Sequence, residues 1–232
     1  MIPFKPFEKI PRLNRVCTIT EKIDGTNGII HIEPLTDVNA LADGNVAVVG
    51  EYLLFAGSRT RWITPAQDNH GFAAWVQDNA EELVAKLGLG THYGEWWGRG
   101  IQRSYGLTEK RFSLFNTARW SDPAVRPACC GVVPVLYEGP FNTEQTVKEL
   151  TILKHWGSHA APGFMDPEGI VVFHHAAGNL FKATIKGDGQ GKHEEAHVKK
   201  ERPSKLPRDP SKGCRRKEQL PFEGEDRRRK AA

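Results

Sequence analysis

The chain has 232 residues and a formal net charge of +4 at neutral pH. No run of 18 apolar residues occurs, and the N-terminus lacks the apolar stretch of a signal peptide, so neither a membrane-spanning nor an exported protein is expected. Residues 187–232 hold 14 Lys and Arg against 9 Asp and Glu, whereas residues 1–186 hold 18 against 19. A uniformly cationic nucleic-acid surface is therefore excluded for the first 186 residues.

The expected strands and helices are predicted from the periodicity of apolar residues. Strands are expected over 16–20, 28–33, 46–49, 52–55, 92–97, 111–115, 132–137, 169–174 and 179–185. A helix is expected from Thr64-Pro65 to Gly88, and a second one from the capping residue Asn142 to Trp156. Many strands with about two helices predict an α+β fold built on antiparallel sheets.

The chain is expected to form one domain over 1–187, with a tail over 188–232. The tail is rich in Gly, Pro, Lys and Arg and has few large apolar residues, so it is expected to be disordered. The four cysteines have no C-x-x-C spacing and are expected to be reduced thiols in a cytoplasmic protein, used in packing rather than as metal ligands. They are Cys17, Cys129, Cys130 and Cys214.

The loop after the first expected strand contains Lys22, Asp24 and Gly25 in a Lys-x-Asp-Gly sequence. Asp and Gly favour a tight turn, which would present the lysine at the end of its strand. A lysine amine attacks an electrophile only when uncharged, so burial or nearby cations must disfavour the ammonium form. Because many ordinary turns contain this tetrapeptide, its meaning depends on the motifs farther along the chain.

Four further motifs occur in order, namely Tyr93–Gly98, Phe112–Asn116, Glu168–Val172 and Leu180–Lys186. The five-part pattern covers about residues 16–188 and resembles the covalent nucleotidyltransferase superfamily of ATP-dependent RNA and DNA ligases and capping enzymes. The stretch GEWWGRGIQ is most similar to phage-type RNA ligases. The resemblance implies an antiparallel-sheet nucleotidyltransferase domain, ATP-grasp-like and related to the adenylation domain of DNA ligases.

The resemblance also implies a reaction. Lys22 would attack the α-phosphorus of ATP, and the resulting lysyl-AMP would activate a 5′-phosphate for displacement by a 3′-hydroxyl. ATP, Mg²⁺ or Mn²⁺, and RNA with those two ends are the implied cofactors and substrate. The implied catalytic residues are Lys22, Lys182 and Glu168, with Glu168 as the metal ligand. The implied nucleotide-binding residues are Glu21, Asp24, Gly25, Arg59, Glu95, Phe115, Lys182 and Lys186.

Several of these roles have a chemical reason. A carboxylate at Glu95 would accept a hydrogen bond from the ribose, and Phe115 would stack on the adenine, with Phe112 as the competing choice. Trp96 and Trp97 are expected to be wall or core residues. Glu168 is a hard oxygen ligand for Mg²⁺.

Two basic segments are expected to contact phosphate. In Ser58-Arg59-Thr60-Arg61, the guanidinium of Arg59 is preferred over that of Arg61. The family pattern Lys-x-Lys is broken here, because Thr184 stands at the second position. Because positions 182, 184 and 186 share one face of a strand, Lys186 is expected to approach the site from farther along that strand.

Alternative functions are a DNA ligase, a capping-type transferase using GTP, and a non-catalytic nucleotide- or RNA-binding module. His193–His197 matches the H-E-x-x-H pattern of zinc proteases but lacks apolar surroundings, and the adjacent Gly-rich run is not a P-loop. Only 46 residues come after Lys186, too few for a C-terminal OB-fold. RNA is therefore expected to be bound by the catalytic domain, the tail or an accessory protein. The location would be the cytoplasm, that of the host if the protein is phage-encoded.

Overall fold

The computed structural model describes residues 2–36 and 44–187. The chain separates into two units, residues 1–189 and 190–232, and both sheets belong to the first. The tail over 188–232, the His193–His197 pattern and Cys214 lie outside the described residues. The boundary at residue 187 stays a prediction.

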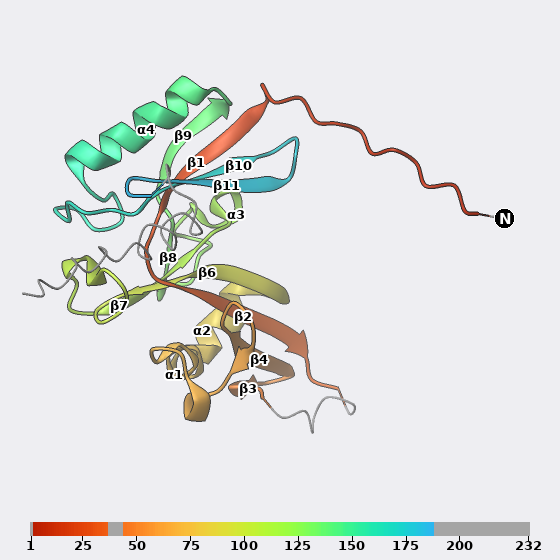
Figure 1. Ribbon diagram of the computed structural model, residues 1–232. Coiled ribbons are helices and arrows are strands. Elements are labelled where there is room, and N and C mark those ends of the chain that lie inside the picture. Colours follow the sequence, from red (N-terminus) through yellow and green to blue (C-terminus); the bar gives the residue numbers. More distant parts are fainter. Residues whose placement is uncertain (1, 37–43, 188–232) are drawn as a thin grey trace, which may run out of the picture. The chain divides into compact units, whose positions relative to one another are not determined.

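A four-stranded antiparallel sheet carries the first expected strand. Its spatial order is β11, β10, β1 and β9, with bounds Asn179–Thr184, Gly169–His174, Val16–Lys22 and Val135–Pro140. Helix α4 (Thr143–Trp156) lies along one face of this sheet (Figure 1). Buried side chains form the core between helix and sheet, namely Cys17, Ile19, Leu153, Ile170 and Val172.

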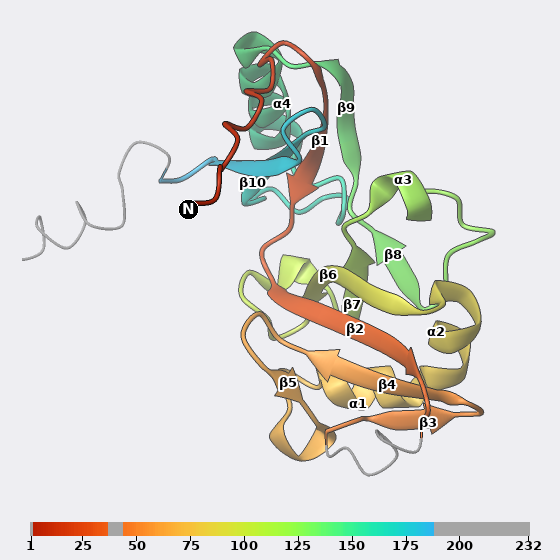
Figure 2. The ribbon, with the colours of Figure 1, turned by 90° about the vertical axis from the view of Figure 1, so that its right-hand side faces the viewer.

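A second sheet of seven strands has the order β3, β4, β2, β6, β7 and β8, with β5 beside β4 (Figure 2). The bounds are Ala47–Val49, Tyr52–Gly57, Thr26–Pro34, Gly90–Gly98, Lys110–Leu114, Cys130–Val132 and, for β5, Trp62–Ile63. One face packs against helices α1 (Phe72–Asp78) and α2 (Ala80–Leu87). The short elements are η1 (Pro65–Gln67), η2 (Ser104–Gly106) and α3 (Thr117–Trp120).

Aromatic packing on glycine joins α1 to this sheet. The rings of Phe72, Trp75, Trp96 and Phe112 form neighbouring pairs with centroids 5.1 to 5.9 Å apart. A Cβ placed on Gly94 would lie 2.5 Å from the Ser113 carbonyl oxygen and 2.6 Å from the Phe112 ring. The missing side chain at Gly94 therefore leaves the room that the Phe112 ring occupies, and the aromatic cluster fixes α1 on the sheet.

The mixed α+β class is confirmed, with three corrections. The strand predicted over 132–137 is wrong, because Pro134 separates β8 from β9 and the two strands belong to different sheets. The helix predicted from Thr64 begins only at Phe72, after a short 3₁₀ turn. The sheets are not wholly antiparallel, since β7 and β8 pair in parallel. None of the helices in the described part of the chain is long and apolar enough to cross a membrane.

Candidate active site

Lys22 and Glu168 meet at one end of the four-stranded sheet. Lys22 ends β1 and is paired with Gly169 of β10, so Glu168, just before β10, lies beside it. The Lys22 Nζ donates to Glu168 Oε2 at 2.6 Å, and the two side chains are 25% and 18% exposed. The two residues predicted to be the nucleophile and the metal ligand are thus in direct contact and only partly open to solvent.

The turn after Lys22 is held from three sides. The Arg103 Nε donates to Asp24 Oδ2 at 2.7 Å, and the Asp24 N–H donates to the Tyr105 hydroxyl at 2.8 Å. The Gly25 N–H donates to Glu95 Oε1 at 3.1 Å. A Cβ on residue 25 would lie 2.5 Å from the Trp96 carbonyl oxygen. Only glycine lets the turn approach β6 this closely, which explains the Asp-Gly pair in structural terms.

Glu95 is a buried carboxylate next to this turn. It also accepts from the Asn27 side-chain amide at 3.3 Å, and only 8% of the residue is exposed. Burial raises its pKa to about 7, against the opposing effects of the Lys22 charge and the Gly25 N–H. The predicted ribose acceptor therefore lies within electrostatic reach of the Lys22–Glu168 pair.

Phe115 lies on the same face of the seven-stranded sheet as Glu95. Glu95 pairs with Ser113 across β6 and β7, and alternation places residue 115 on the face of residue 113. The Phe115 N–H donates to the Tyr93 carbonyl, and 41% of the residue is exposed. The competing Phe112 points to the other face and is fully buried among the α1 aromatics.

Trp96 and Trp97 are each 2% exposed, which agrees with their predicted role as core or wall residues. Since Phe112 is buried, Phe115 is the more accessible aromatic of its own motif, Phe112–Asn116. Its stacking on adenine stays a prediction.

Lys182 shares the face of Lys22. Across β1, β10 and β11, Lys22 pairs with Gly169 and Thr184, and the next row contains Thr20, Val171 and Lys182. Residues opposite each other on neighbouring strands share a face, so Lys182 projects on the Lys22 side, one row away. Its contact with a phosphate stays a prediction.

Lys186 follows the end of β11. The strand β11 ends at Thr184, so the expected alternation over 182, 184 and 186 does not reach the last position. The Lys186 Nζ instead pairs with Asp166 Oδ1 at 2.7 Å, with 68% of its side chain exposed. The approach of Lys186 to the site and its part in nucleotide binding stay predictions.

Arg59 and its competitor Arg61 lie between strands β4 and β5. Arg59 is exposed in the turn between β4 and β5, and no carboxylate within 2–36 and 44–187 pairs with it. The competing Arg61 donates to the Gln67 carbonyl at 3.5 Å. A phosphate contact by Arg59 stays a prediction.

Glu21 is a buried carboxylate that accepts hydrogen bonds from residues 158–160. Its carboxylate is 1% exposed and accepts from the Ser158 hydroxyl at 2.5 Å and from the His159 and Ala160 N–H groups at 2.8 and 2.9 Å. Because successive side chains of a strand alternate, Glu21 points away from the Lys22 face. Its role in nucleotide binding stays a prediction, and the contacts observed hold residues 158–160 against the sheet.

Arg103 is the residue that sequence reasoning missed. Besides Asp24, its guanidinium pairs with Asp166 Oδ2 at 3.1 Å and donates to the Asp166 carbonyl at 2.8 Å. It therefore connects the Lys22 turn to the segment that leads into Glu168. Its neighbours Gln102, Ser104 and Tyr105 all have positive φ, and nothing in their residue types signals such a turn. The signal available was only its place in GEWWGRGIQR.

A pocket of about 340 Å³ lies on the seven-stranded sheet. It is lined in part by Trp97, Arg111, Ser113, Cys129 and Cys130, so none of the predicted site residues lines it. The thiols of Cys129 and Cys130 are 3.9 Å apart and both are free, as is Cys17. Cys130 belongs to the core of the seven-stranded sheet with Cys129 packed against it, and Cys17 belongs to the core beneath α4.

The donor set fits a metal shared with phosphate. Within 2–36 and 44–187, no group of three His, Cys, Asp or Glu residues is arranged for a metal ion. Mg²⁺ is commonly held by one or two carboxylates together with substrate phosphates, so a dedicated protein cage is not required. Over the same residues, Glu168 accepts a hydrogen bond only through Oε2, which leaves Oε1 for such an ion.

Comparison with known proteins gives one family. The sequence profile of the RNA ligase family matches residues 15–184. None of the curated protein sequences compared with the chain matches it.

Solved structures of Naegleria gruberi RNA ligase are similar to the chain. A mutant with ATP and Mn has 18% sequence identity and a TM-score of 0.47 over 82% of this chain and 52% of that one. A mutant with AMP and Mn has 18% identity and a TM-score of 0.46 over 81% and 52%. The chain thus spans about half the length of the solved structures that it matches.

Proposed function

The chain belongs to the RNA ligase family, and from that premise we propose that it joins the 5′-phosphate and 3′-hydroxyl ends of RNA at the expense of ATP. The observation that carries this proposal is the contact between Lys22 Nζ and Glu168 Oε2 at 2.6 Å, with buried Glu95 within electrostatic reach. A nucleophile, a metal ligand and a ribose acceptor are then assembled from three motifs far apart in the sequence. The two-sheet arrangement supports the finer assignment to a nucleotidyltransferase domain.

The first step forms a phosphoramidate. The Lys22 nitrogen attacks the α-phosphorus of ATP, an N–P bond forms, and the bond to the pyrophosphate oxygen breaks. The lysine must lose a proton first, either to Glu168, which is in contact with its Nζ, or to water. Mg²⁺ or Mn²⁺ at Glu168, when bound, neutralises charge on the phosphates. Lys182, on the same sheet face, is the cation assigned to the α-phosphate.

Other residues orient the nucleotide. Glu95 accepts from a ribose hydroxyl and Phe115 provides the exposed face on which adenine stacks. Asp24 and Gly25 set the direction of Lys22, and Arg103 acts on that turn as a positioning residue through Asp24. Arg59 and Lys186 remain assigned to phosphate contacts. Glu21 supports the fold through its hydrogen bonds with residues 158–160.

Two transfers complete the reaction. An oxygen of the RNA 5′-phosphate attacks the lysyl-AMP phosphorus, which releases the lysine and gives an AMP-capped end. The 3′-hydroxyl then attacks the RNA phosphorus, AMP leaves, and a phosphodiester remains. The atoms balance without any further reactant, because ATP supplies pyrophosphate and AMP as leaving groups, the Lys22 amine is regenerated, and the proton of the 3′-hydroxyl passes to water.

The pH dependence of stability provides one test. A folded-state pKa of about 7 for Glu95, above its usual 4.5, means that the folded protein binds more protons between these values. Because of this carboxyl, the free energy of unfolding falls by up to about 3 kcal/mol as the pH rises from about 4.5 through about 7. Glu95→Gln removes the titration. The free energy of unfolding of the variant minus that of the wild type is expected to rise between pH 5 and pH 8 in chemical denaturation.

The same substitution is expected to weaken ATP binding above pH 7, since a neutral amide accepts the ribose hydroxyl less well than a carboxylate. A difference in unfolding free energy that stays flat from pH 5 to pH 8 would show that Glu95 is not held in the protonation state inferred from its burial.

A sealing assay tests the proposed function and its rivals. The protein is incubated with ATP, Mg²⁺ and nicked duplexes that carry RNA or DNA at the nick, and with single-stranded RNA having a 5′-phosphate. Joining of RNA ends and dependence on ATP are expected. Equal or better joining of DNA ends would favour a DNA ligase, and a GTP-dependent adduct would favour capping-type transfer. If the protein forms no adduct and joins no ends, the remaining interpretation is a non-catalytic nucleotide- or RNA-binding module.

Contacts with RNA outside the active site complete the proposal. Basic residues in 188–232, which lie outside the described part of the chain, or an accessory protein are assigned to salt-sensitive phosphate contacts. A cytoplasmic location, that of the host for a phage-encoded protein, is kept in the proposal.

A further inference from the structure

The face of the four-stranded sheet that bears Lys22 continues for two rows beyond it. Strand register places three rows on this face, which are Lys22–Gly169–Thr184, Thr20–Val171–Lys182 and Thr18–Phe173–Leu180. The opposite face is covered by α4 and holds the buried core. One side of the sheet is therefore packed, and the other carries the reactive lysine together with the residues of the two further rows.

The third row exposes apolar side chains. Phe173 is 37% exposed and Leu180 is 68% exposed. The His175 ring lies 4.9 Å from the Phe173 ring, and its Nε2 is 2.9 Å from Thr18 Oγ1. The hydrogen bond holds the imidazole beside the phenyl ring at an interplanar angle of 53°, so the two rings offer neighbouring aromatic faces in a fixed arrangement.

The spacing of the rows suits a nucleic-acid strand. Successive rows on one face are about 7 Å apart, so the Phe173 row lies about 14 Å from the Lys22 row along the strands. With a rise of about 3.4 Å per stacked nucleotide, that distance corresponds to about four nucleotides. Lys182 lies in the row between, so its positive charge adjoins the path of the strand. Besides Glu168 at the Lys22 end, the acid Glu138 is on this face, where it pairs with Thr18 from the outer strand β9. The path favoured by charge therefore runs over β10 and β11.

We infer that this surface, formed by Phe173, His175, Leu180 and Lys182, binds the RNA strand next to the ends being joined, by stacking bases on the aromatic pair. The inference rests on the proposed function. The occupant is RNA because the surface is continuous with the lysine that activates the 5′-phosphate and carries a cation between that lysine and the rings. Exposed aromatics on an antiparallel sheet are a common platform for stacked bases.

Conservative substitutions at Phe173 separate stacking from apolar contact. Phe173→Tyr keeps the aromatic face, whereas Phe173→Leu removes the aromatic face and keeps an apolar side chain. Affinity for single-stranded RNA with a 5′-phosphate and a 3′ fluorophore is measured by anisotropy, and adduct formation with labelled ATP is measured on the same samples. Phe173→Leu is expected to weaken RNA affinity by about 5- to 100-fold and to slow sealing, with adduct formation unchanged. Phe173→Tyr is expected to stay near the wild type.

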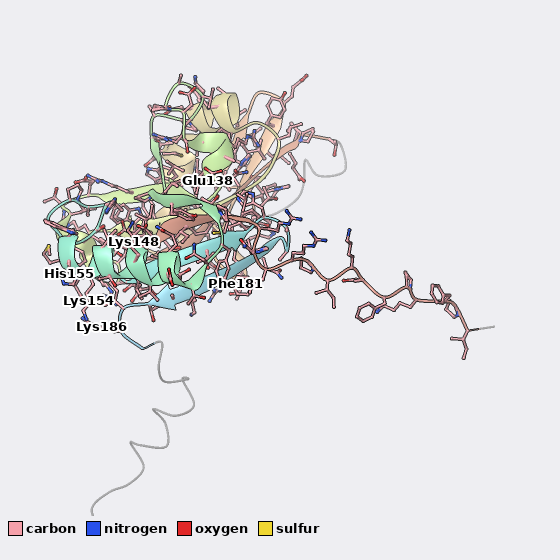
Figure 3. The ribbon with its side chains drawn as sticks, turned by 90° about the horizontal axis from the view of Figure 1, so that it is seen from above. Glu138, Lys148, Lys154, His155, Phe181 and Lys186 are labelled. Carbon is pink, nitrogen blue, oxygen red and sulfur yellow. The ribbon has the colours of Figure 1, made fainter. Side chains whose placement is uncertain are left out.

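The chain offers a matched control at Phe181, which neighbours Leu180 on β11. It is 57% exposed but pairs with core residue Val172 and lies on the side that carries α4 (Figure 3). Phe181→Leu is expected to leave RNA affinity unchanged.

Equal RNA affinity of the Phe173 Leu and Tyr variants, or an equal loss with Phe181→Leu, would overturn the inference. Failure of the proposed function would look different, because then neither the wild type nor any variant would form the adduct. A Phe173→Leu protein that also loses the adduct would place Phe173 in the fold or the first step, and would equally overturn the stacking role.

Discussion

Replacement of Lys22 by methionine is expected to abolish the covalent protein–AMP adduct, with a loss of at least about 10⁴-fold in its rate of formation. Methionine keeps a similar length and apolar stem but has no nitrogen to attack the α-phosphorus. Arginine is expected to fail as well, because its guanidinium stays protonated at any working pH. The measurement is transfer of label from α-labelled ATP to the denatured protein.

The control is Lys148→Met, which removes a lysine from the exposed side of α4 (Figure 3). It should form the adduct like the wild type. Circular dichroism shows whether the Lys22 variant is folded, since it leaves Glu168 without its ion-pair partner. Labelling that persists in the folded Lys22→Met protein would remove Lys22 as the nucleophile.

Replacement of Glu168 by glutamine is expected to slow adduct formation by about 10²- to 10³-fold. The amide keeps the shape of the side chain, and it loses both the charge that pairs with Lys22 and the negative oxygen available to Mg²⁺. Because metal affinity is part of the role, adduct formation is measured over a titration of Mg²⁺. The midpoint of that titration is expected to move to higher concentration, with a lower plateau.

Glu138→Gln is the matched control, since Glu138 is an acid on the outer strand β9 of the same sheet. It should leave both the midpoint and the plateau unchanged. A Glu168→Gln protein within about twofold of the wild type across the titration would show that the carboxylate is a structural partner of Lys22 and no more.

Local patterns predicted the parts of the site that depend on single strands. The strand before Lys22, the Asp-Gly turn and the apolar run after Glu168 are short-range signals. β10 has the expected bounds, whereas β1 runs two residues farther than expected and includes Lys22. The face of each side chain depended on which side of a strand becomes buried. Phe112 and Phe115 are an odd number of positions apart and point to opposite faces, and only the packing of α1 decides which one is covered.

Long-range contacts could not be read from the sequence. Arg103 reaches Asp24 and Asp166 from a turn of positive φ values that non-glycine residues seldom adopt. The position of Glu21 next to Lys22 indicates a nucleotide contact, whereas strand alternation and residues 158–160 make it a buried acceptor. Pro134 interrupts an apolar run that continues in a different sheet.

The most direct measurement is peptide mapping by mass spectrometry after the wild-type protein has been incubated with ATP and Mg²⁺. We predict one AMP group per chain, on the peptide that contains Lys22, with the modified lysine resisting tryptic cleavage. An AMP group on another lysine, such as Lys182, or an unmodified protein that still seals RNA, would contradict the assignment of Lys22 as the nucleophile.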